Sequence, residues 1–139
     1  MSSETISGSC LCGSIKFEIK PPFAAFRYCH CSRCAKGSGS WGHAQGRIPE
    51  EQFRLLQGEE LIKLWRPAEG GAVKAFCSEC GASLFGARWP EGAEISIRLG
   101  VLDGDPQIRP QYHSFVDSAP GWAEIPDDGL ERYPDRPPG

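Results

Sequence analysis

Three cysteines and a histidine are crowded into six residues of the chain, at Cys29, His30, Cys31 and Cys34. Cysteine thiolates are favoured ligands of zinc and of other soft metal ions. A catalytic zinc usually has three protein ligands and keeps a fourth position open for water or substrate. The three thiols of this stretch therefore predict a catalytic metal site whose open position receives a substrate.

The other four cysteines form two closely spaced pairs, Cys10 with Cys12 and Cys77 with Cys80. Alternate residues of an extended strand point to the same face, so the first pair can offer two sulfurs to one ion. The second pair has the two-residue spacer of a zinc knuckle, and Gly81 behind it permits the positive φ of such a turn. Together the two pairs predict a structural metal site with four thiolate ligands.

The spacing of the cysteines leaves other groupings open. In one alternative, the pair at positions 10 and 12 shares an ion with the first two thiols of the central stretch. The thiols left for another site are then Cys34, Cys77 and Cys80. Four thiolates also suit iron, but zinc is favoured because the ferredoxin spacings are absent and an open three-thiolate site suits chemistry without electron transfer.

The length and composition of the chain argue against disulfide bonds among the seven cysteines. A chain of 139 residues fits one domain and can bury a core without disulfides. The sequence begins without the basic and apolar segments of an export signal, and no segment has the roughly 18 consecutive apolar residues of a membrane helix. We therefore expect a cytoplasmic protein, and disulfides do not persist in the reducing cytosol. A net charge of −3 and a pI of about 5.6 argue against nucleic acid as a partner.

Glycine and proline interrupt the sequence so often that strands fit the intervals better than helices. Alternation of apolar and polar residues predicts strands over residues 14–19 and 94–99. Shorter strands are expected over residues 25–28, 41–48, 61–65, 73–76, 83–87 and 112–116. Helical turns are expected only over residues 33–36 and 49–53. These elements predict a mainly β, antiparallel domain over residues 1–132, followed by a Pro-rich C-terminal tail over residues 133–139.

Several side chains near the central cysteines are candidates for binding a substrate. Arg27, Arg33 and Lys36 could balance the charge of the thiolates or bind carboxylates. The turn Ser38–Ser40 could offer backbone N–H groups to a carboxylate, although a plain flexible turn accounts for it equally well.

The three histidines and the tryptophans have competing interpretations. His30 stands between two thiols, so its side chain is expected to point away from a metal bound there. His43 and His113 are each either packed within the fold or close to the substrate. Of the four tryptophans, Trp41 is the one expected near the pocket.

The segments SGSCLCGSIKFEI, YCHCSRCAKGSGS and FCSECGASLFG occur in this order and resemble those of the glutathione-dependent formaldehyde-activating enzyme family. The domain of this family also occurs in the centromere protein V group, and the resemblance extends from about Gly8 to Arg132. It implies an Mss4-like fold with small antiparallel β-sheets around two zinc ions per chain. The structural zinc would be held by Cys10, Cys12, Cys77 and Cys80, and the catalytic zinc by Cys29, Cys31 and Cys34.

The family's reaction joins glutathione to formaldehyde as S-hydroxymethylglutathione, and its reverse is a carbon–sulfur lyase step. The resemblance thus implies a small thiol such as glutathione as the partner. One segment departs from the family, because Asp117–Trp122 has an acid where members often carry a lysine before a Pro-Trp element. The alternative function is a non-catalytic zinc-binding module that binds a protein or senses thiol-reactive compounds. Two closed zinc sites would need eight ligands, so with seven cysteines this alternative requires a histidine as the last ligand.

Overall fold

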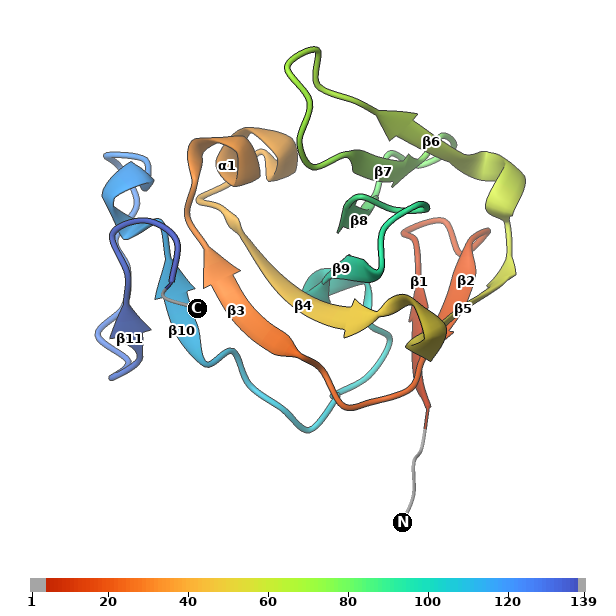
Figure 1. Ribbon diagram of the computed structural model, residues 1–139, viewed down its shortest axis with the longest axis horizontal. Helices are drawn as coiled ribbons and strands as arrows, with labels where there is room; N and C mark the ends of the chain where they lie inside the picture. The colour runs from red at the N-terminus through yellow and green to blue at the C-terminus, as the bar shows by residue number, and fades with distance from the viewer. Residues whose placement is uncertain (1–4, 138–139) are drawn as a thin grey trace.

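The computed structural model describes residues 5–137, which fold into two β-sheets with one short α-helix (Figure 1). The smaller sheet has three strands in the order β1-β2-β5, and both pairs are antiparallel. Its strands are β1 (Ile6–Ser9), β2 (Lys16–Ile19) and β5 (Phe53–Gln57). The predicted mainly β class is confirmed.

The larger sheet has eight strands in the order β11-β10-β3-β4-β9-β8-β7-β6. Its strands are β3 (Ala25–Cys29), β4 (His43–Pro49), β6 (Ile62–Trp65), β7 (Lys74–Cys77), β8 (Ser83–Ala87), β9 (Glu94–Arg98), β10 (Tyr112–Ser114) and β11 (Glu131–Arg132). Most neighbours are antiparallel, but β10 runs parallel to both β3 and β11. The sheet is therefore mixed at this edge, because the chain after β9 crosses to the far side of β3.

The helical segments are short. The α-helix, α1 (Ser32–Ser38), begins shortly after β3 ends. The 3-10 helices are Glu50–Gln52, Glu59–Leu61, Leu99–Val101 and Val116–Ser118. The helical turn expected over residues 49–53 is thus a 3-10 helix. Between residues 5 and 137, no helix is both long enough and apolar enough to cross a membrane.

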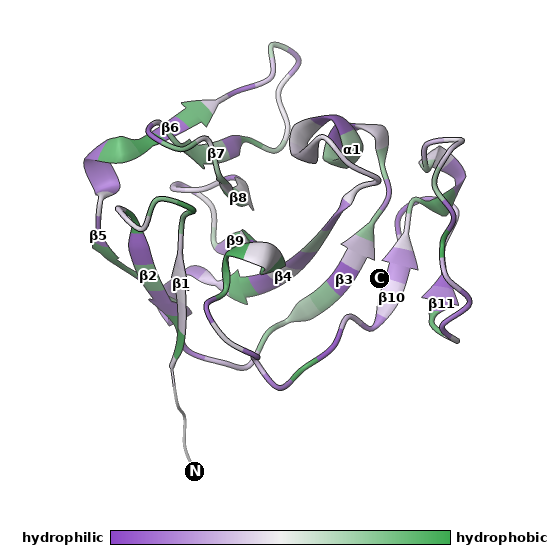
Figure 2. Cartoon of the chain, turned by 180° about the vertical axis from the view of Figure 1, so that it is seen from behind, coloured by the Kyte–Doolittle hydropathy of each residue, from purple (hydrophilic) through white to green (hydrophobic). Residues whose placement is uncertain are grey.

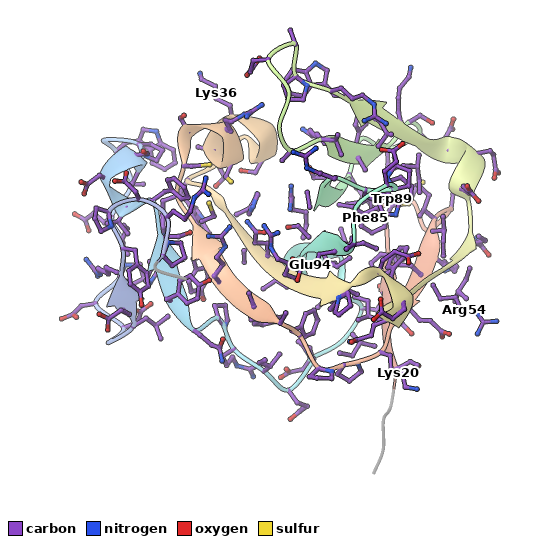
Figure 3. All side chains as sticks on the ribbon, in the orientation of Figure 1. Lys20, Lys36, Arg54, Phe85, Trp89 and Glu94 are labelled. Carbon is purple, nitrogen blue, oxygen red and sulfur yellow. The ribbon has the colours of Figure 1, made fainter. Side chains whose placement is uncertain are left out.

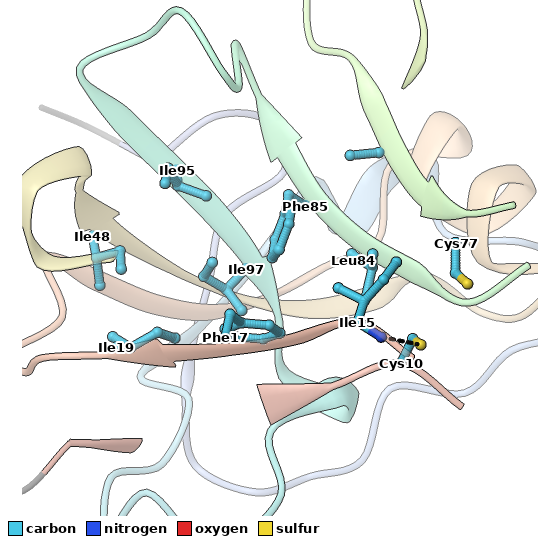
Figure 4. Close-up of a cluster of buried hydrophobic side chains, with 11 residues drawn as sticks. Cys10, Ile15, Phe17, Ile19, Ile48, Cys77, Leu84, Phe85, Ile95 and Ile97 are labelled. Carbon is cyan, nitrogen blue, oxygen red and sulfur yellow. Dashed lines mark hydrogen bonds between the residues drawn. The ribbon is translucent and has the colours of Figure 1, made fainter. Parts of the chain in front are cut away.

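The core lies where the small sheet packs against the larger one (Figure 4). Polar and apolar residues alternate along β2 (Figure 2), which places Phe17 and Ile19 on its buried face. The Phe17 ring meets the ring of Phe85 on β8 edge-on, with centroids 5.2 Å apart. Ile97 on β9 is also fully buried in this cluster. Full burial of each such side chain stabilises the fold by about 1.5–3 kcal/mol.

Each strand range expected from the sequence contains a strand, whereas β1, β5 and β11 were not predicted. The beginning of the predicted tail is attached to the fold. The carbonyl groups of Tyr133 and Asp135 accept hydrogen bonds, each 3.0 Å long, from the N–H groups of Val116 and Phe115. The last two residues of the tail lie outside the described range, and the division into domain and tail stays a prediction.

Candidate metal centres and the adjoining cavity

Four thiols from distant parts of the sequence meet at one place: Cys10, Cys12, Cys77 and Cys80. Their sulfur atoms all lie within 4.8 Å of one another, with 3.6 Å between Cys10 and Cys12 and 3.9 Å between Cys12 and Cys77. Gly81 has the positive φ, 78°, that the knuckle spacing predicted. We call this set the four-thiol cluster, and thiols converging in this way could hold one metal ion.

A turn positions Cys10 and Cys12, whereas Cys77 ends β7 and Cys80 lies in the turn that follows this strand. Cys10 and Cys12 lie in a turn closed by the Gly13 N–H, which donates to the Cys10 carbonyl at 3.0 Å. The extended backbone predicted for this pair is therefore wrong, although the turn still brings the two sulfurs together. A backbone hydrogen bond from Ala82 lowers the pKa of the Cys80 thiol to about 6. At Cys80 the fold thus favours the thiolate form that metal binding requires, whereas burial raises the pKa of the Cys77 thiol to about 11.

The other three thiols, the three-thiol cluster, converge where β3 is followed by α1. Cys29 ends β3, Cys31 is the N-cap of α1, and Cys34 lies in the first helical turn. The Cys34 sulfur lies 3.0 Å from the Cys31 sulfur and 3.3 Å from the Cys29 sulfur. The Cys34 N–H donates to the Cys31 sulfur at 3.3 Å, so the start of the helix orients one of these thiols. Hydrogen bonds from the other two thiols hold the pKa of Cys29 below its ordinary value.

The thiols are thus grouped as four and three, and the alternative grouping of the N-terminal pair with the central stretch is not observed. Among residues 5–137, no histidine or carboxylate joins either set at the same separation. Either cluster could hold a metal ion, and the smaller one would supply three protein ligands. The choice of zinc, and the structural and catalytic roles of the two clusters, stay predictions.

A cavity of about 810 Å³ adjoins the three-thiol cluster, and its wall includes all three thiols. This volume suits a small-molecule ligand. The cationic side chains that line the cavity are Arg27, Arg33, Lys36, Arg47, Lys74 and Arg98. The first three were expected from the sequence, and Lys36 projects from α1 (Figure 3), while the others come from β4, β7 and β9. No aspartate or glutamate in the described part of the chain lines the cavity.

A chain of hydrogen bonds follows the cavity wall from Arg98 to Cys34. Arg98 Nη1 donates to Ser96 Oγ at 3.0 Å, and Ser96 Oγ donates to Gln45 Oε1. Gln45 Nε2 lies 3.1 Å from His43 Nε2, which lies 3.4 Å from the Cys34 sulfur. Because a guanidinium can only donate, this order leaves the Gln45 amide N–H facing His43. Burial and the charge of Arg98 lower the pKa of His43 to about 3, so its imidazole is neutral at neutral pH.

His30 and His113 belong to a second polar chain, and neither lines the cavity. His113 Nε2 donates to Asp128 Oδ2 at 2.9 Å, and this hydrogen bond holds the pKa of Asp128 below its ordinary value. His113 Nδ1 lies 2.8 Å from His30 Nε2, so one of these two ring nitrogens donates to the other. Burial lowers the pKa of His30, whose Nδ1 is buried without a hydrogen-bond partner. The chain ties the C-terminal segment to the stretch that carries the three-thiol cluster.

Two features expected at the substrate site lie elsewhere. The turn after α1 uses its own N–H groups, because those of Gly39 and Ser40 both donate to the Ala35 carbonyl. These donors are therefore occupied within the helix cap and do not face a ligand. Trp41 packs against neighbouring aromatic rings, and Trp65 lines the cavity in its place.

Gly42 allows the start of β4 to lie close to the three-thiol cluster. A Cβ atom at this position would lie 2.2 Å from the carbonyl oxygen of Cys29. We expect Gly42→Ala to push these backbones apart, to destabilise the protein by about 1–3 kcal/mol and to lower the metal content. Gly37→Ala is the matched control, because a Cβ atom there meets nothing within 4 Å. Denaturant unfolding and metal analysis check the prediction, and identical behaviour of the two variants would refute it.

Residues 5–118 match the model of a family described as "Glutathione-dependent formaldehyde-activating enzyme". The chain belongs to this family. The resemblance carried by the three cysteine-containing segments is thereby confirmed. All the cysteines of this formaldehyde-activating enzyme family member, and all its cavity-lining residues, fall within the matched range.

Individual relatives agree with the family match. A Halomonas elongata protein named "Putative glutathione-dependent formaldehyde-activating enzyme" is 29% identical over 142 residues, which cover 94% of this chain and 89% of that protein. A Colletotrichum graminicola protein of the same name is 30% identical over 95 residues, covering 65% of this chain and 48% of that protein. The crystal structure of a Rhodobacter sphaeroides protein matches with a TM-score of 0.59 and 24% identity, covering 75% of this chain and 97% of that chain. The last likeness supports the fold of this family member.

Proposed function

We propose that the protein is a zinc-dependent enzyme of the carbon–sulfur lyase type that acts on the adduct of a thiol and a small aldehyde. The adduct is S-hydroxymethylglutathione if the reactants are the two compounds in the family's name, glutathione and formaldehyde. The observation that carries the proposal is that the three-thiol cluster forms part of the cavity wall. No cysteine of the four-thiol cluster lines the cavity, which is in keeping with a structural role for its metal.

Both clusters could hold zinc because their donors are thiols that all lie within 4.8 Å of one another. The four-thiol cluster would provide a complete ligand set, and the three-thiol cluster would provide Cys29, Cys31 and Cys34. Zinc bound by three thiolates supplies a position for a fourth sulfur, which it holds as thiolate.

Formation of the adduct joins the thiol sulfur to the aldehyde carbon, and the thiol proton ends on the aldehyde oxygen. The reverse step breaks the same carbon–sulfur bond. The neutral ring of His43 lies beside the Cys34 sulfur and would form one side of the reacting position. Val73 and Phe76 add apolar surface to the cavity wall, which would exclude water from the reactants. These side chains would act mainly by holding the thiol and the aldehyde in one orientation.

The cationic side chains of the cavity would bind the acidic groups of the thiol. Guanidinium groups form paired hydrogen bonds with carboxylates, and the wall contains four arginines. A carboxylate held in this way would fix the distance between the thiol sulfur and the three-thiol cluster. Binding of the distant end of the thiol would thus help to position its reacting end.

Exchange spectroscopy of a glutathione and formaldehyde mixture tests this function. We expect the zinc-loaded protein to accelerate formation and breakdown of the adduct equally, by about tenfold or more, because orientation of the reactants alone can supply more than this. Protein stripped of metal is the control. A zinc-loaded protein that leaves the exchange rate unchanged would favour the non-catalytic zinc module.

A further inference from the structure

The cavity is cationic although the whole chain is acidic. The net charge of the chain is −3, yet six cations and, within residues 5–137, no carboxylate line the cavity. The cations come from β3, α1, β4, β7 and β9, so several parts of the fold direct positive charge to one place. Even three ionised thiolates do not offset six cations, and the cavity keeps an excess of positive charge.

Few of these charges are neutralised by ion pairs. Arg33 lies 3.5 Å from Glu69, and Arg47 lies 3.5 Å from Glu94. These pairs are open to solvent and therefore weak. In the described part of the chain, the cavity cations without a carboxylate within 4.0 Å are Arg27, Lys36, Lys74 and Arg98.

The guanidinium of Arg98 occupies space beside β8 that the lack of a side chain at Gly86 leaves free. A Cβ atom on Gly86 of β8 would lie 2.5 Å from Arg98 Nη2, so only a glycine there accommodates the guanidinium in this position. The guanidinium donates to Ser96 through Nη1. An arginine side chain has five N–H donors, so within residues 5–137 most of those of Arg98 remain for a ligand. This geometry is suited to an anionic group inside the cavity.

Glutathione matches this charge pattern only in part. At neutral pH it carries two carboxylates and one ammonium group, and the described cavity wall has no carboxylate to pair with the ammonium. We infer that the preferred thiol of this site carries at least two acidic groups and no ammonium group. The inference rests on the proposed function, since it specifies the thiol for the same site.

N-acetylglutathione isolates the contribution of the ammonium group. Acetylation removes one positive charge and leaves the thiol and both carboxylates unchanged. Like charges in a partly enclosed site repel each other, and salt weakens this repulsion. We therefore expect N-acetylglutathione to bind about tenfold more tightly than glutathione at low ionic strength, with a smaller ratio at high salt.

Calorimetric titration of the zinc-loaded protein with the two thiols measures this ratio. Arg98→Gln and Lys36→Gln each remove one cavity cation and should reduce the preference for N-acetylglutathione. Lys36 is exposed on α1, so its replacement leaves the fold intact. Arg54→Gln is the matched control, because Arg54 is exposed on β5, away from α1 and the cavity (Figure 3), and the ratio should not change.

The possible outcomes separate the inference from the function on which it rests. Equal affinity for the two thiols, or a ratio that neither cavity variant changes, would overturn the inference and leave the thiol site in place. Absence of binding by both thiols at millimolar concentration would overturn the proposed function and the inference with it.

Discussion

Cys77→Ser is expected to unfold the protein or to make it aggregate during expression. Cys77 is fully buried, and its sulfur lies 3.9 Å from that of Cys12, which is 65 residues away in the sequence. A structural zinc at this cluster would contribute on the order of 10 kcal/mol to the folded state. This is as large as the whole stability of an ordinary domain. Circular dichroism during heating and zinc analysis of the soluble protein measure the effect.

Ser78→Ala provides the control for this variant. Ser78 is the next residue in the same turn, its side chain is exposed, and it does not belong to the four-thiol cluster. The control should melt as the unaltered protein does and retain all its zinc. A soluble Cys77→Ser protein with unchanged melting and zinc content would show that the four-thiol cluster does not hold a structural metal.

Cys34→Ser is expected to abolish thiol binding while most of the fold persists. Cys34 contacts both other sulfurs of the three-thiol cluster, so its loss leaves only two thiols to hold the metal. Replacing residues that merely support metal ligands already lowers metal affinity or activity by about 10–100-fold, and loss of a ligand should cost at least as much. Zinc analysis should show loss of one ion per chain, and calorimetry should show no heat with glutathione.

The matched control for Cys34→Ser is Ser32→Ala, which alters an exposed residue at the start of the same helix. This control should keep both its metal content and its affinity for thiols. If Cys34→Ser instead unfolds as completely as Cys77→Ser, the two clusters do not have separate structural and catalytic roles.

Local spacing predicted parts of both clusters correctly. The two-residue spacer between Cys77 and Cys80, followed by Gly81, determines a turn by itself, and that turn is present. The extended backbone predicted at Cys10 and Cys12 was wrong, because the sulfurs of residues i and i+2 can meet through a turn as well as along a strand. The pairing of the N-terminal cysteines with the knuckle depends on strand order, and spacing alone could not choose it.

The cavity wall could be predicted only where it lies near the central cysteines. Arg27 and Arg33 were found because they flank the thiols in sequence. Arg98 and Gln45 are 53 positions apart in the sequence and face each other only because of the register in which β4 pairs with β9. Each residue by itself resembles an ordinary polar position of a half-exposed strand, so no local pattern reveals the hydrogen-bonded chain that they share.

We propose that the three-thiol cluster holds a metal with an open position that binds a thiol as thiolate. Calorimetric titration of the zinc-loaded protein with glutathione, in two buffers of different ionisation enthalpy, tests this proposal. Because a free thiol is mostly protonated at neutral pH, binding should release close to one proton per chain, and the release should disappear in Cys34→Ser. Absence of heat at millimolar glutathione and N-acetylglutathione, or binding without proton release, would contradict the claim.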